Sequence, residues 1–195
     1  MNLIERARKL ILSPTTEWAA IAAEQPSVVQ IFTGYVVPLA LIPALGQLIG
    51  TGLFGRDQMS AMTSGIATAV ISFVSSIAGV YLTALIVDFL APNFGSQKNF
   101  GRAVQLVAYS YTPAWLAGIL HIVPALGFLV FLASLYGLFL VYLGLPPTMK
   151  TPGDRVVIYL VVTIVAVIIV SAVLAALLGV IVFGMIDLGS VSMTG

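Results

Sequence analysis

Long, nearly uncharged stretches of apolar residues constrain this chain more than any other feature of its sequence. Of its 195 residues, 60% are hydrophobic and 8% are charged, whereas soluble domains carry roughly 25% charged residues. A helix needs about 20 consecutive apolar residues to cross the ~30 Å hydrocarbon core of a bilayer. The sequence therefore predicts an all-α, polytopic integral membrane protein.

Five stretches have the length and composition of transmembrane helices. They cover approximately residues 28–54, 61–90, 103–122, 125–143 and 155–186. The second stretch carries small residues at spacings of three or four, which predicts close packing against another helix backbone. The fourth is expected to stop at Pro146-Pro147, because proline lacks the backbone donor that continues a helix. The fifth is almost entirely aliphatic and is expected to face lipid.

Residues 1–27 form a more polar, amphipathic segment ahead of the five-span domain of residues 28–195. Two short helices are expected here, over residues 2–12 and from Pro14 to Glu24. In the first helix, one face is apolar and the other charged: Leu3, Ile4, Ala7, Leu10 and Ile11 oppose Glu5, Arg6, Arg8 and Lys9. The segment either lies in the headgroup layer or packs under the ends of the membrane helices, and the two arrangements are compatible. Its apolar runs are too short for a cleavable signal peptide, so none is expected.

The basic residues predict the orientation of the chain. With five spans, seven of the eight Lys and Arg residues fall on the side of the N-terminus, and only Arg56 falls on the other side. Basic loops remain on the cytoplasmic side of a membrane. We therefore expect a cytoplasmic N-terminus and a periplasmic C-terminus. The net charge of +1 gives no indication of a nucleic-acid partner.

The third expected span contains the main candidate functional or structural motif. Gln105, Tyr109 and Thr112 fall at positions i, i+4 and i+7, which places them on one helical face. Pro113 leaves the carbonyl of Tyr109 without its helical donor. A hydroxyl or amide from a neighbouring helix, or a water molecule, must then satisfy that carbonyl. Tyr136 in the fourth span belongs to the same candidate motif.

Two titratable residues near the expected ends of spans have two interpretations each. Asp88, near the end of the second span, either forms an interfacial ion pair with Lys98 or Arg102 or takes part in transport or binding. His121, near the end of the third span, is either a residue at headgroup level or a ligand. The sequence favours the interfacial interpretation for both residues.

The sequence offers little material for catalysis. It contains no cysteine, one histidine and seven acidic residues. It also lacks a His-Glu-x-x-His pair, a nucleophile elbow and a glycine-rich phosphate loop. No pair of carboxylates inside the expected spans could divide acid and base roles. We therefore expect no catalytic residue, no metal, no cofactor and no enzymatic activity.

A series of motifs in fixed order resembles the Yip family, the Ypt/Rab-GTPase-interacting membrane proteins, in its bacterial form. The matching residues are Ile11-Leu12-Ser13-Pro14 with Trp18, Tyr35–Leu39, Phe94-Gly95, Phe100, Tyr109–Pro113, Pro124–Gly127, Tyr136 and Tyr142–Pro146. The resemblance covers nearly the whole chain. It implies five spans and a cytoplasmic N-terminus, and in eukaryotic relatives it implies vesicle trafficking, GTPase association and hetero-oligomers.

Three departures from the family pattern bear on the partners of this chain. The Asp-Leu-Tyr-Gly-Pro motif expected before the first span is absent, as is a long cytoplasmic N-terminal domain, and Ala108 stands where a Gly-Tyr pair is usual. A GTPase partner is therefore doubtful. A bacterial inner-membrane protein is the expectation.

Two functional hypotheses follow. In the first, the protein is a non-enzymatic scaffold that organises membrane lipids and other membrane proteins, or copies of itself in a homo-oligomer. It would use the small residues of the second span and the amphipathic N-terminal segment. In the second, it is a small channel or transporter with a polar cavity between spans one and three, because prolines interrupt both.

Overall fold

A computed structural model describes residues 2–25, 27–54 and 58–192, with side chains for 2–25, 27–53 and 62–177. All regular structure in these ranges is helical. The elements are α1 (Leu3–Leu12), α2 (Pro14–Ala23), α3 (Val28–Ile31), η1 (Phe32–Val36), α4 (Val37–Phe54), α5 (Gln58–Leu90), η2 (Ala91–Phe94), α6 (Phe100–Ser110), α7 (Thr112–Ala117), η3 (Gly118–Ile122), η4 (Pro124–Leu126), α8 (Gly127–Met149) and α9 (Val156–Ser192).

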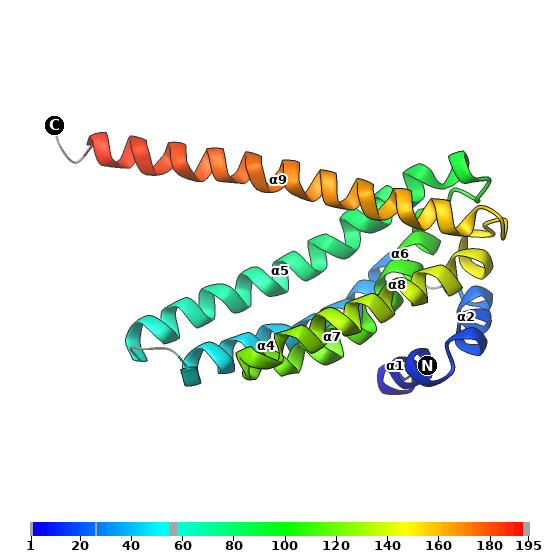
Figure 1. The fold of residues 1–195 in the computed structure, drawn as a ribbon, viewed down its shortest axis with the longest axis horizontal. Helices are drawn as coiled ribbons and strands as arrows, with labels where there is room; N and C mark the ends of the chain where they lie inside the picture. The colour runs from blue at the N-terminus through cyan, green and yellow to red at the C-terminus, as the bar shows by residue number, and fades with distance from the viewer. Residues whose placement is uncertain (1, 26, 55–57, 193–195) are drawn as a thin grey trace.

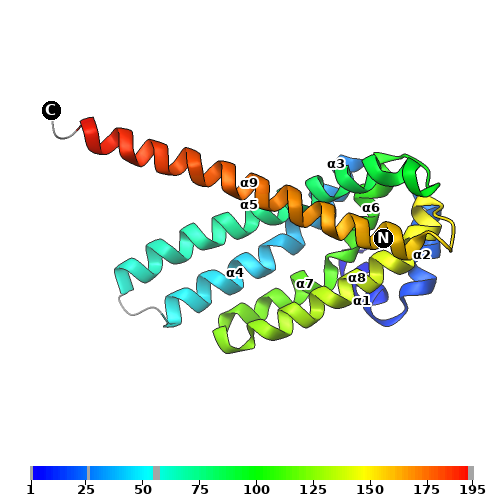
Figure 2. The same cartoon turned by 45° about the horizontal axis from the view of Figure 1, so that its top comes forward.

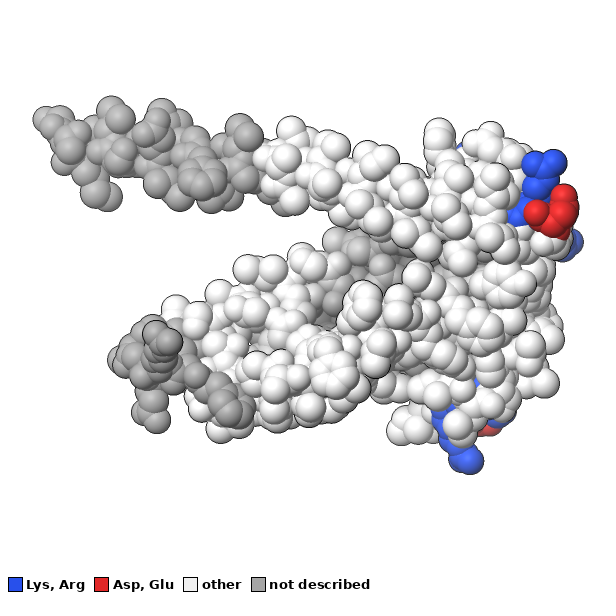
Figure 3. Space-filling model, viewed as in Figure 1, with Lys and Arg blue, Asp and Glu red and all other residues white. Residues whose placement is uncertain are grey.

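The long helices α4, α5, α8 and α9 run roughly along one direction, and the short helices α1 and α2 lie at one end of them (Figures 1 and 2). Four described segments are long and apolar enough to cross a membrane: Val28–Leu53, Met62–Phe94, Pro124–Met149 and Val156–Leu177. The charged side chains visible on the described surface in Figure 3 gather at the end where α1, α2 and the α8–α9 connection lie. The chain is therefore an all-helical, multi-span membrane protein, and we name this end the charged end.

The expected third span, residues 103–122, consists of three shorter pieces. Helix α6 ends at Ser110, α7 starts at Thr112, and the chain tightens into the 3₁₀ helix η3 at Gly118. The interruption falls next to Pro113, which cannot donate the backbone hydrogen bond that would continue α6. No single long helix represents this span among the four described candidates.

The fourth span runs further than predicted. Helix α8 does not stop at Pro146-Pro147 but continues to Met149. Both prolines lie in its last turns, where the Thr148 hydroxyl donates a 2.6 Å hydrogen bond to the carbonyl of Gly144. The helix ends instead at Lys150, whose left-handed backbone (φ 53°) reverses the chain.

The small residues of α5 pack against α4 within the same chain. Gly65 lies against Leu48 and Thr51, and Ser72 accepts a 3.2 Å hydrogen bond from the amide of Gln47. Close packing was the predicted use of these residues. Since α4 already covers part of this face, it is less available to another protein than the sequence alone indicated.

The N-terminal hairpin, α1 and α2, packs on the membrane helices at the charged end. Leu10, Trp18 and Ile21 are almost fully buried. Trp18 lies against α8 at Gly144, where an added Cβ would come within 2.8 Å of the indole ring and 2.5 Å of Leu106. A bulky ring on the hairpin therefore sits in a space that the missing side chain of Gly144 leaves open.

Candidate functional site

The polar residues predicted on one face of the third span are buried together. The Tyr35 and Thr112 hydroxyls are 2.7 Å apart, and the Thr112 hydroxyl donates a 2.6 Å hydrogen bond to the carbonyl of Tyr109. This is the carbonyl that Pro113 was expected to leave without its helical donor. Its partner is the residue directly before the proline, and Tyr35 of η1 joins the same network from the first span.

The ring of Tyr109 joins this network to the N-terminal hairpin. The ring of Tyr35 meets it edge-on at a centroid distance of 4.8 Å, and the ring of Trp18 lies 6.4 Å away. On the hairpin side, the guanidinium carbon of Arg6 lies 5.1 Å from the Tyr109 ring centroid, within the range of a cation–π contact. The candidate motif of the third span thus lies at the junction of spans one and three with the hairpin.

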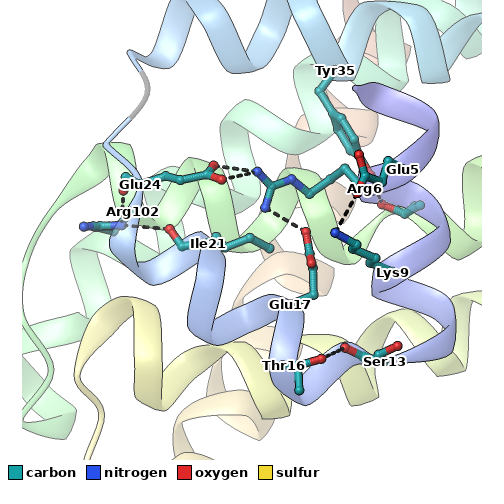
Figure 4. Close-up of polar contacts among 11 residues, drawn as sticks. Glu5, Arg6, Lys9, Ser13, Thr16, Glu17, Ile21, Glu24, Tyr35 and Arg102 are labelled. Atoms are coloured by element: carbon teal, nitrogen blue, oxygen red, sulfur yellow. Dashed lines mark hydrogen bonds and ion pairs between the residues drawn. The ribbon is translucent and has the colours of Figure 1, made fainter. Parts of the chain in front are cut away.

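Arg6 is at the centre of a group of charges, drawn in Figure 4. It donates hydrogen bonds to Glu17 at 2.9 Å and to both carboxylate oxygens of Glu24 at 2.5 and 2.6 Å. Arg6 and Glu17 are each only 4% exposed. Burial alone lowers the pKa of Arg6, but the hydrogen bond to Glu24 and the neighbouring carboxylates raise that pKa overall, so the guanidinium stays charged.

Arg102, near the start of α6, also binds the hairpin. Its Nη1 atom donates hydrogen bonds to the carbonyls of Glu24 at 2.7 Å and Ile21 at 3.3 Å, and to the side-chain oxygen of Gln105 at 3.0 Å. The first contact gives a partner to the carbonyl of Glu24, the C-cap residue of α2, and the second adds to the 3.1 Å hydrogen bond that the Ile21 carbonyl accepts from the Glu24 N–H. Arg6, Glu17, Glu24 and Arg102 together form what we call the Arg6 cluster.

The Arg6 cluster was not predicted, and the division of α1 into two faces was wrong for Arg6. Arg6 was placed on the charged face but is buried, and of the residues on the apolar face Leu10 is packed inside whereas Ile4 is 72% exposed. A signal for the cluster was present, because Glu17 and Glu24 lie on the same helical face as the buried Ile21. A carboxylate on a packed face needs a buried cation as its partner.

The remaining candidates lie outside this junction. Asp88 sits near the end of α5, and the expected ion pair with Lys98 or Arg102 is not formed: in the part of the chain with described side chains, Asp88 takes part in no ion pair and its Oδ1 atom is buried without a hydrogen bond. Arg102 instead donates its hydrogen bonds to the hairpin and to Gln105.

The Tyr136 hydroxyl donates a 2.9 Å hydrogen bond to the carbonyl of Ile11 and so connects α8 to α1. His121 contacts the carbonyl of Gly118 in its own helix at 3.0 Å.

Spans one and three meet through their backbones over part of the region where the sequence suggested a polar cavity. A Cβ added at Gly46 of α4 would lie 2.5 Å from the Gly118 carbonyl oxygen, and one added at Gly118 would lie 2.5 Å from Pro43. Gly50 makes a similarly close approach to the carbonyl of His121. At this depth the two spans are in direct contact, whereas nearer the charged end a cavity of about 240 Å³ lies between the hairpin, Gly34 and Tyr35 of span one, and Tyr109 of span three.

The site as a whole provides structural contacts. Many of its polar groups pair with one another, although Gln105 Nε2 and Trp18 Nε1 are buried without a hydrogen-bond partner among the described residues. Within the described ranges, no group of three or more His, Cys, Asp or Glu residues could hold a metal ion. The buried hydroxyls of Tyr35 and Thr112 are bonded to each other, not to a base that could activate them. The arrangement can fasten the hairpin to two spans.

Comparisons with known proteins identify relatives of the whole chain. The sequence model of the Yip1 domain matches residues 8–186. The chain is similar to proteins named "Inner membrane protein YohC" from Escherichia coli strain K12 and from E. coli O6:H1 strain CFT073, with 27% identity over 151 residues in each case. These alignments cover 70% of this chain and 75% of each relative. No solved structure matches.

Proposed function

The chain belongs to the Yip1 domain family, and on this basis we propose that it is a non-enzymatic inner-membrane protein that acts as a scaffold for other membrane proteins or for copies of itself. The relatives are inner-membrane proteins by name, which supports the same membrane here. The main support for the proposal is that the buried polar groups make structural contacts, which join the N-terminal hairpin to spans one and three.

Exposed apolar surface supports a role in assembly within the membrane. Helices α5 and α9 present outward-facing aliphatic side chains along most of their described length, among them Val70 and Val74 on α5 and Val165 and Ile169 on α9. Lipid or neighbouring transmembrane helices must cover such faces. On α1, Ile4 and Leu12 are 72% and 68% exposed and would reach the headgroup layer.

We further propose that the chain crosses the membrane five times, with a cytoplasmic N-terminus. The connection after α5 is bonded to the connection after α8, through Gln97 N–H to the Met149 carbonyl at 2.8 Å and Ser96 to Thr151 at 2.8 Å. The segment α6–α7–η3 therefore starts at the charged end. It must reach the far end of α8, because α8 returns from there to Met149. This course supports a fifth crossing made of separate helical segments. The basic residues at the charged end support a cytoplasmic location for that end.

Cysteine labelling tests this topology, since the natural chain has no cysteine. In intact cells, Val123→Cys between η3 and η4 is expected to react with a membrane-impermeant maleimide. Asp154→Cys, in the exposed connection between α8 and α9, is expected to react only after the inner membrane is opened. The cysteine-free protein is the control. Labelling of both variants from the same side would show that α6–α7–η3 does not cross.

Site-specific photo-crosslinking tests the scaffold role. A crosslinking amino acid at Val74 of α5, Val165 of α9 or Phe131 of α8 would sample three outward-facing surfaces. We expect crosslinked adducts with proteins at one contiguous surface. These adducts should still form when the variant is expressed at the native level. Two differently tagged copies would distinguish self-association from association with other proteins. Adducts with lipid alone at all three positions would contradict the proposal.

A further inference from the structure

A polar cavity of about 440 Å³ lies at the charged end, between the hairpin, the start of α6 and the end of α8. Its lining residues are Ala22, Gln25, Gln97, Asn99, Gly101, Arg102, Gln105, Pro147, Thr148 and Lys150. The size is within the range of small-ligand sites. The scaffold proposal makes no use of this cavity.

The charge of the cavity lining has one sign. Arg102 and Lys150 contribute two cations, and no Asp or Glu lines the cavity. The hydrogen bonds of Arg102 to protein all run from Nη1, so the other guanidinium nitrogens keep donors for a ligand. Lys150 is exposed and takes part in no ion pair in the described structure. An anion in the cavity would therefore meet two cations and no repelling carboxylate from the lining.

The N-terminus of α6 opens onto the same cavity. Asn99 caps this helix by accepting a hydrogen bond from the Arg102 N–H at 3.1 Å. The N–H of Gly101, which also lines the cavity, precedes the first intrahelical bond and has no helical acceptor. Helix N-termini attract anions through such N–H groups and through the helix dipole.

An independent observation comes from Gln105, one turn further along α6. It lines the cavity, is only 1% exposed, and its Nε2 atom is buried without a hydrogen-bond partner in the described structure. Its Oε1 atom is already held by Arg102 at 3.0 Å. A buried amide donor without a partner costs free energy that a bound acceptor would recover.

We propose that this cavity binds a phosphate group, from either an anionic phospholipid headgroup or a soluble phosphate compound. Arg102 and Lys150 supply the charge, and the Gly101 N–H and the Gln105 amide supply donors. A tetrahedral oxyanion matches this combination, because it accepts several hydrogen bonds at once and carries the complementary charge. The inference is independent of the scaffold role.

Two variants test the site without removing contacts that hold the fold. Gln105→Glu keeps the size of the side chain and the acceptor for Arg102, but replaces the free amide donor with a negative charge. Lys150→Asn removes a cation at a position where asparagine tolerates the left-handed backbone. The matched control is Lys98→Asn, which removes the same charge from a nearby exposed lysine that does not line the cavity.

The first measurement uses inorganic phosphate added to the purified full-length protein in detergent, with chloride at equal ionic strength as the reference. We expect saturable binding by calorimetry to the natural protein and to Lys98→Asn, and roughly tenfold weaker binding to Gln105→Glu and Lys150→Asn. The unfolding temperature of each variant without phosphate shows that it is folded. The second measurement reconstitutes the same proteins in phosphatidylcholine bilayers with and without phosphatidylglycerol, and counts retained phosphatidylglycerol by native mass spectrometry.

The two measurements separate the sources of the phosphate. Retention of phosphatidylglycerol that Gln105→Glu abolishes and Lys98→Asn preserves would assign the site to a lipid headgroup. Inorganic phosphate binding with the same pattern, but without lipid retention, would assign it to a soluble compound. Absence of both, or equal binding to all four proteins, would overturn the proposal.

Discussion

Replacing Arg6 with methionine is expected to destabilise the docked N-terminal hairpin by about 3–5 kcal/mol, the cost typical of breaking a buried ion pair on one side. Methionine keeps much of the apolar volume of the arginine stem. The substitution leaves the 4%-exposed Glu17 without its 2.9 Å partner, so a carboxylate remains buried without a cation. It also removes the cation–π contact with Tyr109. Hydrogen exchange of α1 and α2 and the unfolding temperature in detergent would measure the effect.

The control and the rescue variant separate the ion pair from a general loss of charge. Arg8→Met removes the same charge from an exposed position on α1 and is expected to change the stability by less than about 0.5 kcal/mol. Adding Glu17→Gln to Arg6→Met removes the isolated carboxylate and is expected to restore part of the loss. If Arg6→Met proved as stable as Arg8→Met, the buried ion pair would not hold the hairpin.

Gly46→Ala is expected to lower the free energy of unfolding by about 1–3 kcal/mol, as overpacking a tight interface typically does. The new methyl carbon would lie 2.5 Å from the Gly118 carbonyl oxygen and 3.3 Å from the Ile119 Cα, both backbone atoms that cannot rotate away. Helices α4 and η3 would have to separate, and the close contact between spans one and three would be lost. Thermal unfolding in detergent, compared with the natural protein, would show the change.

Gly52→Ala on the same helix is the matched control. A Cβ at Gly52 would meet nothing within 4 Å. Alanine there is expected to be neutral or to stabilise the helix by up to about 1 kcal/mol, because it favours helix more than glycine does. Equal destabilisation by both substitutions would mean that helix flexibility, not the contact with η3, accounts for the effect.

The parts of this fold that depend on local sequence could be predicted. The all-helical class follows from the long apolar stretches, and the two hairpin helices and the common face of Tyr109 and Thr112 follow from residue spacing. The free carbonyl of Tyr109 follows from the chemistry of Pro113. The end of α8 was misjudged because two prolines can be accommodated in the last turns of a helix. Pro113 was expected to free one carbonyl of the third span, and the structure divides that span into separate helical pieces.

The parts that depend on distant segments could not be predicted. Trp18 fits against Gly144, and Arg102 binds carbonyls of α2; both contacts join residues far apart in the chain. Amphipathic patterns also place every charge outside, so they assign Arg6 to solvent. A buried charge becomes visible only when its partners Glu17 and Glu24 are considered on the facing helix.

The position of the hairpin has a consequence for the order in which the protein assembles during synthesis. Arg6, Glu17 and Glu24 all precede the membrane helices in the chain, so the hairpin can close on itself before those helices are synthesised. Its receiving surface, made by Leu106, Tyr109 and Gly144, exists only after α8 has been translated and inserted. A hairpin that can fold before the membrane helices is thus among the last elements to dock, and its docking marks a protomer whose central helices are complete.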